Sequence, residues 1–283
     1  MKKLLALALA VIMSISMVAC GGGEKEKSTI DQILEQGYIT CAISPDFAPS
    51  EFKDPNTGEV MGTDVVFAEY IADYISKKYD KPVELKIKEM DFSACQAAVS
   101  TNSVNFSLSG YAETEERAQN YNCVGPYATI SSDEDTYHGA LVKKGLVIEK
   151  VEDFAGLKVG VQPASLQYNL LQDQLDVDSL AEVMFIDNLS MAAQMVAEGK
   201  IDCLITDSGV GDLQVKNNDK LEMAGFKFEY FAEGNCGLVN LDEVELAQLI
   251  EEALLAADKD IDYVQIRQDM RDKAASMGLE VND

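Results

Sequence analysis

Apolar residues occur along the chain at two alternating spacings, which predict strands and helices in turn. Short apolar runs predict strands at Tyr38–Ile43, Val83–Ile87 and Phe106–Ser109. Between these strands, apolar residues recur every three or four positions, which predicts one helix over 65–75 and a second over 93–101. The pattern therefore gives the order strand, helix, strand, helix, strand.

The same order appears a second time after residue 157. Strands are predicted at 158–161, 183–186 and 203–205, and helices at 165–174, 189–198 and 208–216. The tail adds a strand at 237–240 and helices at 244–256 and 263–277. Strands that alternate with helices favour parallel sheets with both faces covered. We therefore expect an α/β protein with two similar lobes, each a mostly parallel sheet flanked by helices.

Polar residues predict where several elements begin and end. Thr29–Gln32 and Ser93–Gln96 have the spacing of helix capping boxes, and Gly37 and Gly199 are typical helix ends. The turn-forming residues from Pro45 to Gly62 predict a long loop.

The first twenty residues have the pattern of an export signal. Two lysines precede an apolar stretch, and the segment Met17–Cys20, followed by three glycines, resembles the bacterial lipobox. The apolar stretch is shorter than the roughly 20 residues that a membrane-spanning helix needs. An ordinary signal peptide, with Cys20 incidental, is the alternative. We expect a lipoprotein signal peptide over 1–19, lipidation of Cys20, and a flexible tether over 20–28 on the extracellular face of the bacterial cell membrane.

Composition excludes several functions. The chain has 283 residues, with 23 Lys and Arg against 49 Asp and Glu, for a net charge of -26. Phosphate contacts need clustered basic side chains, so a nucleic-acid partner is not expected. The single histidine, His138, excludes a multi-histidine metal site, and no metal or cofactor is expected. The cysteines after Cys20 are odd in number and have no close pair in sequence, which favours buried free thiols over disulfides but leaves both open: Cys41, Cys95, Cys123, Cys203 and Cys236.

Two charged residues that follow predicted strands are candidates for binding a ligand. Arg117 follows Ser109 and Gly110 and could bind a carboxylate, or could simply pair with Glu113 one helical turn earlier. Asp207 could hold an ammonium group, or could cap the helix that follows it.

Two aromatic residues also lie at the carboxyl ends of predicted strands. Phe47 and Phe92 could flank an apolar part of a ligand, or could be ordinary core residues.

The order of short motifs over 29–270 resembles the extracellular solute-binding proteins of family 3, which are amino-acid receptors of ABC importers. The resemblance lies in Gly37-Tyr38-Ile39, Phe47-Ala48-Pro49, Gly62-Thr63-Asp64-Val65, Met90-Asp91-Phe92, Thr114-Glu115-Glu116-Arg117, Gly125-Pro126-Tyr127, Lys158-Val159-Gly160-Val161-Gln162, Gly199-Lys200-Ile201-Asp202 and Asp207.

The resemblance implies a two-lobe clamshell of the type II periplasmic-binding-protein kind, with two crossover segments. Lobe 1 would comprise 29–128 plus 232–283, and lobe 2 would comprise 129–231. An α-amino acid would bind in the cleft between them.

The resemblance also implies roles for single residues. Arg117 would bind the ligand's α-carboxylate, helped by amides near Ala112, Ser165 and Leu166. Asp207 would bind the α-ammonium group with Ser109 and Gly110.

The ligand's side chain would lie between Phe47 and Phe92, with Ser44 and Gln162 at its tip. Ala112, where the family usually has a hydroxyl, removes one neutral hydrogen bond, which is worth less than the charge-assisted bonds of Arg117 and Asp207. Ser44, where receptors for cationic ligands often have Asp, favours an uncharged ligand. Two carboxylates close in sequence, Asp46 and Glu51, count against this, or could simply belong to a solvated loop.

The function implied is capture of an amino acid by a monomeric, membrane-anchored receptor, which delivers it to an ABC permease powered by a separate ATPase subunit. The sequence lacks a Walker-type phosphate loop, so the chain itself is not expected to hydrolyse nucleotide. Two alternatives are a ligand-sensing lipoprotein of a signalling receptor and a dehydratase-like enzyme on the same scaffold. We expect no enzymatic activity, because Glu113 and Asp207 are the only obvious acids and no Lys or His accompanies them in the motifs.

Overall fold

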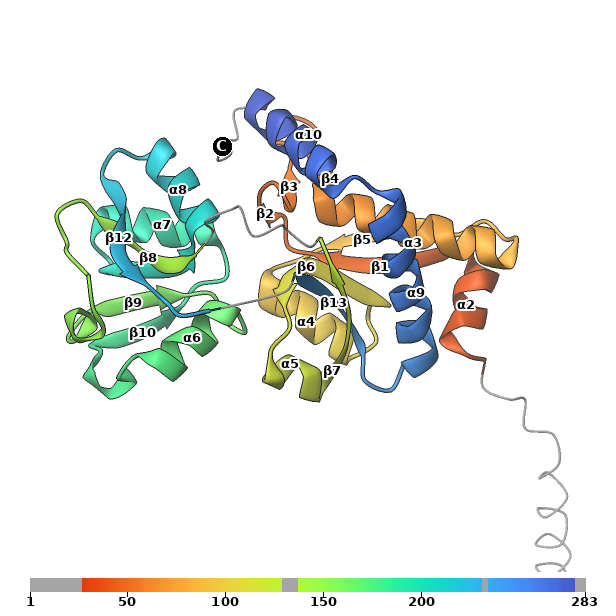
Figure 1. Ribbon diagram of the computed structural model, residues 1–283, viewed down its shortest axis with the longest axis horizontal. Helices are drawn as coiled ribbons and strands as arrows, with labels where there is room; N and C mark the ends of the chain where they lie inside the picture. The colour runs from red at the N-terminus through yellow and green to blue at the C-terminus, as the bar shows by residue number, and fades with distance from the viewer. Residues whose placement is uncertain (1–26, 129–136, 231–233, 278–283) are drawn as a thin grey trace, which may run out of the picture.

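The computed structural model describes residues 27–128, 137–230 and 234–277. Two separate five-stranded sheets organise these residues into two lobes (Figure 1). We call the described residues of 27–128 and 234–277 the first lobe, and those of 137–230 the second lobe. The expected signal peptide, the lipidation site Cys20 and most of the tether lie outside the described residues.

The first sheet has the strand order β5-β1-β6-β13-β7. Its strands are β1 (Tyr38–Ile43), β5 (Glu84–Glu89), β6 (Phe106–Ala112), β7 (Tyr121–Tyr127) and β13 (Asn235–Asn240). β1 runs parallel to both β5 and β6, whereas β13 runs antiparallel to β6 and β7. The chain therefore leaves this sheet after β7 and returns to it with β13, between β6 and β7, so the second lobe is an insertion in the first.

The second sheet has the order β10-β9-β11-β8-β12. Its strands are β8 (His138–Lys143), β9 (Lys158–Val161), β10 (Glu182–Phe185), β11 (Cys203–Asp207) and β12 (Leu221–Lys227). β9 pairs in parallel with β10 and β11, and β8 is antiparallel to β11 and β12. The expected α/β class with two lobes is confirmed, and each sheet combines parallel and antiparallel pairings.

Helices cover both faces of each sheet (Figure 1). In the first lobe, α3 (Thr63–Tyr79) and α9 (Val244–Asp260) pack on one face with Ile39, Cys41 and Ile43, while α4 (Phe92–Ser100) packs on the other face with Ala42. This alternation follows from the two-residue repeat of a strand. The remaining helices of this lobe are α2 (Thr29–Gln36), α5 (Glu115–Asn120) and α10 (Tyr263–Ser276).

The second lobe has the same arrangement. α6 (Leu166–Gln174) packs with Val159 and Val161, and α7 (Leu189–Glu198) packs with Leu141 and Leu204. The other helical segments are α8 (Ser208–Asn217) and two short 3-10 turns, Val151–Phe154 and Val177–Ser179.

Three local predictions were wrong. Ser28, not Thr29, caps α2, because its side chain accepts a hydrogen bond from the Asp31 amide. The cap of α4 is Asp91 rather than Ser93.

The third error concerns the predicted loop over 45–62. It contains a small three-stranded sheet of β2 (Asp46–Phe47), β3 (Glu51–Lys53) and β4 (Val60–Met61). Strands of two or three residues are too short to show an alternating pattern.

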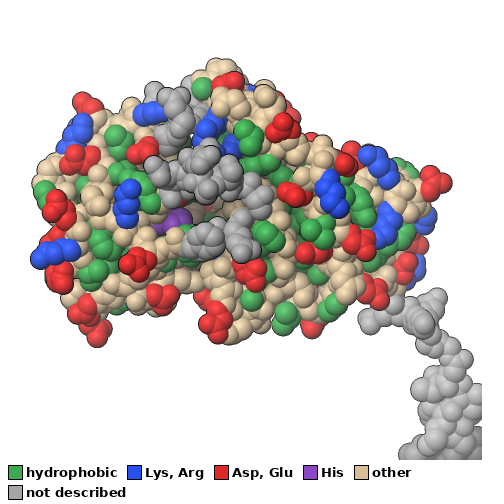
Figure 2. Space-filling view, in the orientation of Figure 1, with side chains coloured by type: hydrophobic (Ala, Val, Ile, Leu, Met, Phe, Trp, Pro, Cys, Tyr) green, Lys and Arg blue, Asp and Glu red, His purple; other side chains and the backbone are tan. Residues whose placement is uncertain are grey.

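The helices of the described residues include none long and apolar enough to cross a membrane. Figure 2 shows acidic side chains spread over the surface of both lobes, among fewer basic ones. The negative charge is thus distributed over the visible face rather than gathered at one site.

Candidate functional site

Each lobe places a carboxylate at the first turn of a helix in the other lobe. Asp187 Oδ1 accepts a 2.7 Å hydrogen bond from Ser93 Oγ and a 3.4 Å bond from the Ser93 amide, near the start of α4. Reciprocally, Asp46 Oδ2 accepts a 3.4 Å bond from the amide of Leu189, the first residue of α7. The free amides and the dipole of a helix N-terminus favour negative charge. The two lobes are therefore in direct polar contact across their cleft.

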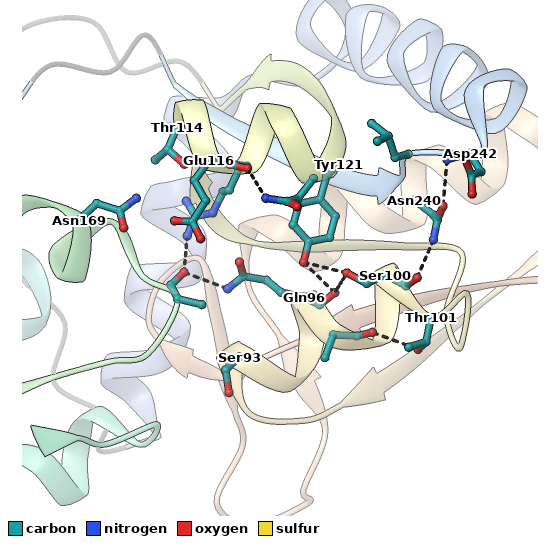
Figure 3. Close-up of a pocket in the computed structure, with 15 residues that line it drawn as sticks. Ser93, Gln96, Ser100, Thr101, Thr114, Glu116, Tyr121, Asn169, Asn240 and Asp242 are labelled. Carbon is teal, nitrogen blue, oxygen red and sulfur yellow. Dashed lines mark hydrogen bonds between the residues drawn. The ribbon is translucent and has the colours of Figure 1, made fainter.

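A second contact between the lobes converges on one backbone carbonyl. The oxygen of Ala164, in the second lobe, accepts hydrogen bonds from Arg117 Nη2 at 2.9 Å and from Gln96 Nε2 at 3.1 Å, both in the first lobe. In Figure 3 the two dashed lines meet at this oxygen. Ala164 has a φ of 54°, in the left-handed region that is uncommon for alanine.

Arg117 is a buried cation, only 4% exposed. Thr114 caps its helix by accepting a hydrogen bond from the Arg117 amide, and Arg117 Nη1 donates to the carbonyl of Ala112 at 2.6 Å. The guanidinium carbon lies 5.2 Å from the ring centre of Tyr111 and 5.8 Å from that of Phe92. Within the described part of the chain, no carboxylate forms an ion pair with Arg117, so the alternative pairing with Glu113 does not occur.

A groove of about 700 Å³ opens beside the guanidinium (Figure 3). Its walls come from α4, α5, the segment after β13, and the start of α6 in the second lobe. Most of the side chains drawn in Figure 3 are polar, including Gln96, Thr114 and Asn169. Of the residues predicted from sequence to bind a ligand, only Arg117 lines this groove.

Other predicted carboxylate-site residues lie on both sides of Arg117. Ala112 supplies its carbonyl to the guanidinium and packs with Leu166 in a cluster of the second lobe. Ser165 caps α6, because its hydroxyl accepts a hydrogen bond from the Tyr168 amide at 3.1 Å. The first turn of α6 therefore begins next to Ala164.

The predicted residues at the ends of β1 and β6 form a second group. The Ser44 amide donates a 2.8 Å hydrogen bond to Ser109 Oγ, and Ser44 Oγ donates to Asp46 Oδ1 at 3.2 Å. Gly110 has a φ of 57°, and a Cβ added there would lie 3.5 Å from the ring of Phe47. A glycine suits this position because this left-handed φ is unfavourable for other residues, whereas a Cβ would make only an ordinary contact with the ring.

The two predicted aromatic walls come from different elements. Phe47 belongs to β2 and lies beside Gly110. Phe92 begins α4 and packs against Tyr111, with ring centres 5.1 Å apart. Phe92 therefore also forms part of the surroundings of Arg117.

Gln162, another predicted residue, stabilises the segment that carries Asp187. Its side chain is 7% exposed and donates a 2.6 Å hydrogen bond from Nε2 to the Asp187 carbonyl. Sequence reasoning missed Asp187, Gln96 and Ala164. Asp187 follows a strand as Asp46 does, which is the one signal that could have pointed to it.

Asp207 ends β11 and caps α8, so the capping prediction is confirmed. Its Oδ1 accepts a 2.7 Å hydrogen bond from the Gly209 amide. Burial is the main cause that raises the pKa of Asp207 from 3.8 to about 6. Asp207 is also the register partner of His138 on β8.

His138 is neutral near pH 7, because burial lowers its pKa from 6.5 to about 4. Its Nδ1 lies 3.1 Å from Gln167 Nε2, and its ring meets Tyr230 edge-on at 5.1 Å.

Comparison with known sequences gives the family. Residues 39–270 match the bacterial extracellular solute-binding proteins, family 3. The chain belongs to this family. The resemblance noted in the motifs is thereby confirmed, and the match spans both lobes.

Several relatives are similar over most of the chain. The arginine-binding extracellular protein ArtP of Bacillus subtilis (strain 168) is 27% identical over 222 residues, covering 78% of this chain and 79% of ArtP. A mutant of ArgBP from T. maritima is 26% identical, with a TM-score of 0.71 and coverage of 85% of this chain and 98% of that one.

Two further similar structures are of ancestral arginine-binding proteins, one with arginine and one with glutamine. An ancestral arginine-binding protein bound to arginine is 29% identical, with a TM-score of 0.69 and coverage of 83% of this chain and 98% of that one. An ancestral arginine-binding protein bound to glutamine is 28% identical, with a TM-score of 0.69 and coverage of 83% of this chain and 97% of that one. These relatives are binding proteins rather than enzymes, and their structures confirm the two-lobe fold.

Proposed function

We propose that this protein captures a free α-amino acid between its lobes and delivers it to the permease of an ABC importer. The observation that carries the proposal is the environment of the buried Arg117 guanidinium. A buried guanidinium without a carboxylate partner in the described structure is costly unless an anion completes its coordination. Two of its five N–H groups reach carbonyls, which leaves others for a ligand carboxylate.

The ligand's ammonium group would bind Asp207 together with Ser109 and Gly110. An ammonium group stabilises the ionised form of Asp207, which burial otherwise disfavours. Because Arg117 is in the first lobe and Asp207 in the second, a zwitterion that binds both would favour the closed form.

The ligand's side chain would be polar. Ser44 and Gln162 supply neutral hydrogen-bonding groups, and Asp46 supplies a carboxylate that contacts the second lobe. Asp46 weakens the argument against a cationic ligand that rested on Ser44 alone. Arginine and glutamine are the first ligands to test, since similar ancestral arginine-binding proteins were solved with one or the other.

A thermal-shift screen of free amino acids on protein lacking residues 1–20 tests the proposal. A ligand that binds only the folded state raises the unfolding temperature. For the best ligand, the α-amide and the deaminated acid serve as matched controls, since each removes one charge of the zwitterion. Stabilisation by the amino acid but by neither control supports the proposal, and equal stabilisation by the amide contradicts the role of Arg117.

We also propose that the mature protein is anchored to the outer face of the membrane by lipid on Cys20 and acts there as a monomer. The permease and its ATPase would be separate subunits. Membrane fractionation of the full chain and of Cys20→Ser tests the anchor. We expect the parent in the membrane fraction and the variant outside it; equal partitioning would contradict lipidation.

A further inference from the structure

Two buried carboxyl groups, Glu51 and Asp64, lie beside the proposed ammonium site and have no part in the proposed function so far. Glu51 is 1% exposed and Asp64 is 0% exposed. Glu51 is on β3, and Asp64 is in the first turn of α3. Their side chains are within hydrogen-bonding reach of each other.

Each carboxyl group has one buried oxygen without a donor. Asp64 Oδ2 accepts a 2.9 Å hydrogen bond from the Gly110 amide and a 3.1 Å bond from the Tyr127 hydroxyl. Asp64 Oδ1 and Glu51 Oε2 have no hydrogen-bond partner. Buried polar atoms without partners are uncommon and costly. One proton held between the two carboxyl groups would give each group a hydrogen-bond partner.

The surroundings decide which group carries the proton. Burial raises the pKa of Glu51 well above its usual value and raises the pKa of Asp64 to about 6. The two donors on Asp64 stabilise its ionised form, and two adjacent buried carboxylates cannot both ionise readily. Glu51 is therefore the acid of the pair and Asp64 the carboxylate.

The pair is joined to three residues of the proposed ligand site. The Gly110 amide binds Asp64 directly. Glu51 is within hydrogen-bonding reach of Ser109, whose Oγ also accepts the Ser44 amide. The ends of β1 and β6 are thus held by one network that starts at the carboxyl pair.

We propose that Glu51 and Asp64 share one proton and act as positioning residues for the ammonium end of the ligand site. The shared proton holds Ser109 and Gly110 in place, and the remaining negative charge favours a cationic group beside them. This inference rests on the proposed function, since it assigns the ammonium group to Ser109 and Gly110.

Among the described residues, the titratable groups that act most strongly on the pair or are acted on by it include no cation. They are an acid, two phenols and two thiols: Asp46, Tyr111, Tyr127, Cys41 and Cys95. Burial raises the pKa of each phenol and thiol, so these four are neutral near pH 7. The negative charge of the pair is therefore not cancelled by a neighbour in this set.

Infrared difference spectroscopy of the ligand-free protein, comparing the parent with Glu51→Gln near pH 7, tests the shared proton. We expect the carbonyl stretch of an un-ionised carboxyl group in the parent and its loss in Glu51→Gln. Absence of this band from the parent, or its persistence in Glu51→Gln, would overturn the proposal. The spectrum needs no ligand, so its outcome is independent of the proposed function.

Calorimetry tests the effect on the ligand site. Asp64→Asn removes the charge but keeps a similar shape, so we expect the preference for the amino acid over its deaminated acid to fall by about tenfold or more. The separate variant Glu51→Gln keeps a neutral donor toward Asp64, so it should retain most of the parent's preference for the amino acid over its deaminated acid. Equal weakening of both ligands by Asp64→Asn would indicate a structural role and overturn the inference. Failure of the parent to bind any amino acid, with the infrared result intact, would instead refute the proposed function.

Discussion

Asp46 and Asp187 make reciprocal contacts across the cleft. Each follows a strand of its own lobe, and each accepts a hydrogen bond from the first or second residue of a helix in the other lobe. Carboxylates at helix N-termini are stabilised by the dipole and by the free amides. The pair links the lobes directly, and it contributes to closure alongside the bonds that converge on Ala164.

Removing one of these carboxylates should favour the open form. In Asp187→Ala, Ser93 loses its partner in the second lobe, and a charged-group hydrogen bond contributes about 1.5–3 kcal/mol. We expect a larger radius of gyration for the ligand-free variant by small-angle X-ray scattering.

Asp173→Ala is the matched control for that experiment, because Asp173 is an exposed acid on α6 of the same lobe. The control should scatter like the parent. If Asp187→Ala also scatters like the parent, the contact does not contribute measurably to closure.

The raised pKa of Asp46 predicts that this residue stabilises the folded protein more at low pH than near neutral pH. Burial is the main cause that raises its pKa from 3.8 to about 6, so the folded protein binds this proton more tightly than the unfolded chain does. The contribution of Asp46 to stability is therefore largest below pH 4 and is lost as the pH rises to about 6. Relative to Asp46→Asn, the parent should lose about 1–3 kcal/mol between these pH values in urea unfolding. A constant difference between parent and variant would contradict this prediction.

Asp207 predicts the pH dependence of binding. Its pKa is raised to about 6 in the absence of ligand, and an ammonium group needs its ionised form. Affinity should therefore fall by up to about tenfold per pH unit below pH 6 and level off above pH 7. In Asp207→Asn, affinity should be lower near pH 7 and the dependence between pH 5 and 7 should be reduced. Calorimetry at several pH values checks this, and an identical profile in the variant would remove Asp207 from the site.

The five free cysteines predict the number of thiols that a thiol-reactive reagent should find in the protein. Cys41, Cys95, Cys123, Cys203 and Cys236 are free in the structure, as the sequence favoured, and all but Cys123 are buried. In native protein lacking residues 1–20, a thiol reagent should react slowly with the four buried thiols, and after unfolding without reductant it should find five thiols. Three thiols instead would indicate one disulfide. Cys123 and Cys236 are the pair within reach of each other.

Several inner strands of the two sheets were predictable because they are short, nearly continuous apolar runs. Two strands, Tyr38–Ile43 and Lys158–Val161, begin and end at the predicted residues. The helix Leu189–Glu198 also has its predicted limits. β7, β8 and β12 were not predicted, and in β12 the buried and exposed residues do not alternate regularly. The sequence predicted the cap at Asp207 because capping depends on residues next to each other in the chain.

The contacts between the lobes could not be predicted in the same way. Ala164 and Gln96 are 68 residues apart, and only the relative placement of the lobes brings them together. The orphaned oxygens of Glu51 and Asp64 likewise depend on how β3 and α3 pack, which no local pattern specifies. Motif resemblance could point to Arg117, but its two carbonyl partners required the structure.

The central claim is that Arg117 binds the carboxylate of an amino acid. A double-mutant cycle by calorimetry tests it most directly, using parent and Arg117→Gln, each with the best amino acid and with its α-amide. If the guanidinium binds the carboxylate, each single change should weaken binding by about 1.5–3 kcal/mol, and both changes together should cost little more than one. Additive losses would show that Arg117 and the carboxylate do not interact, and would contradict the account.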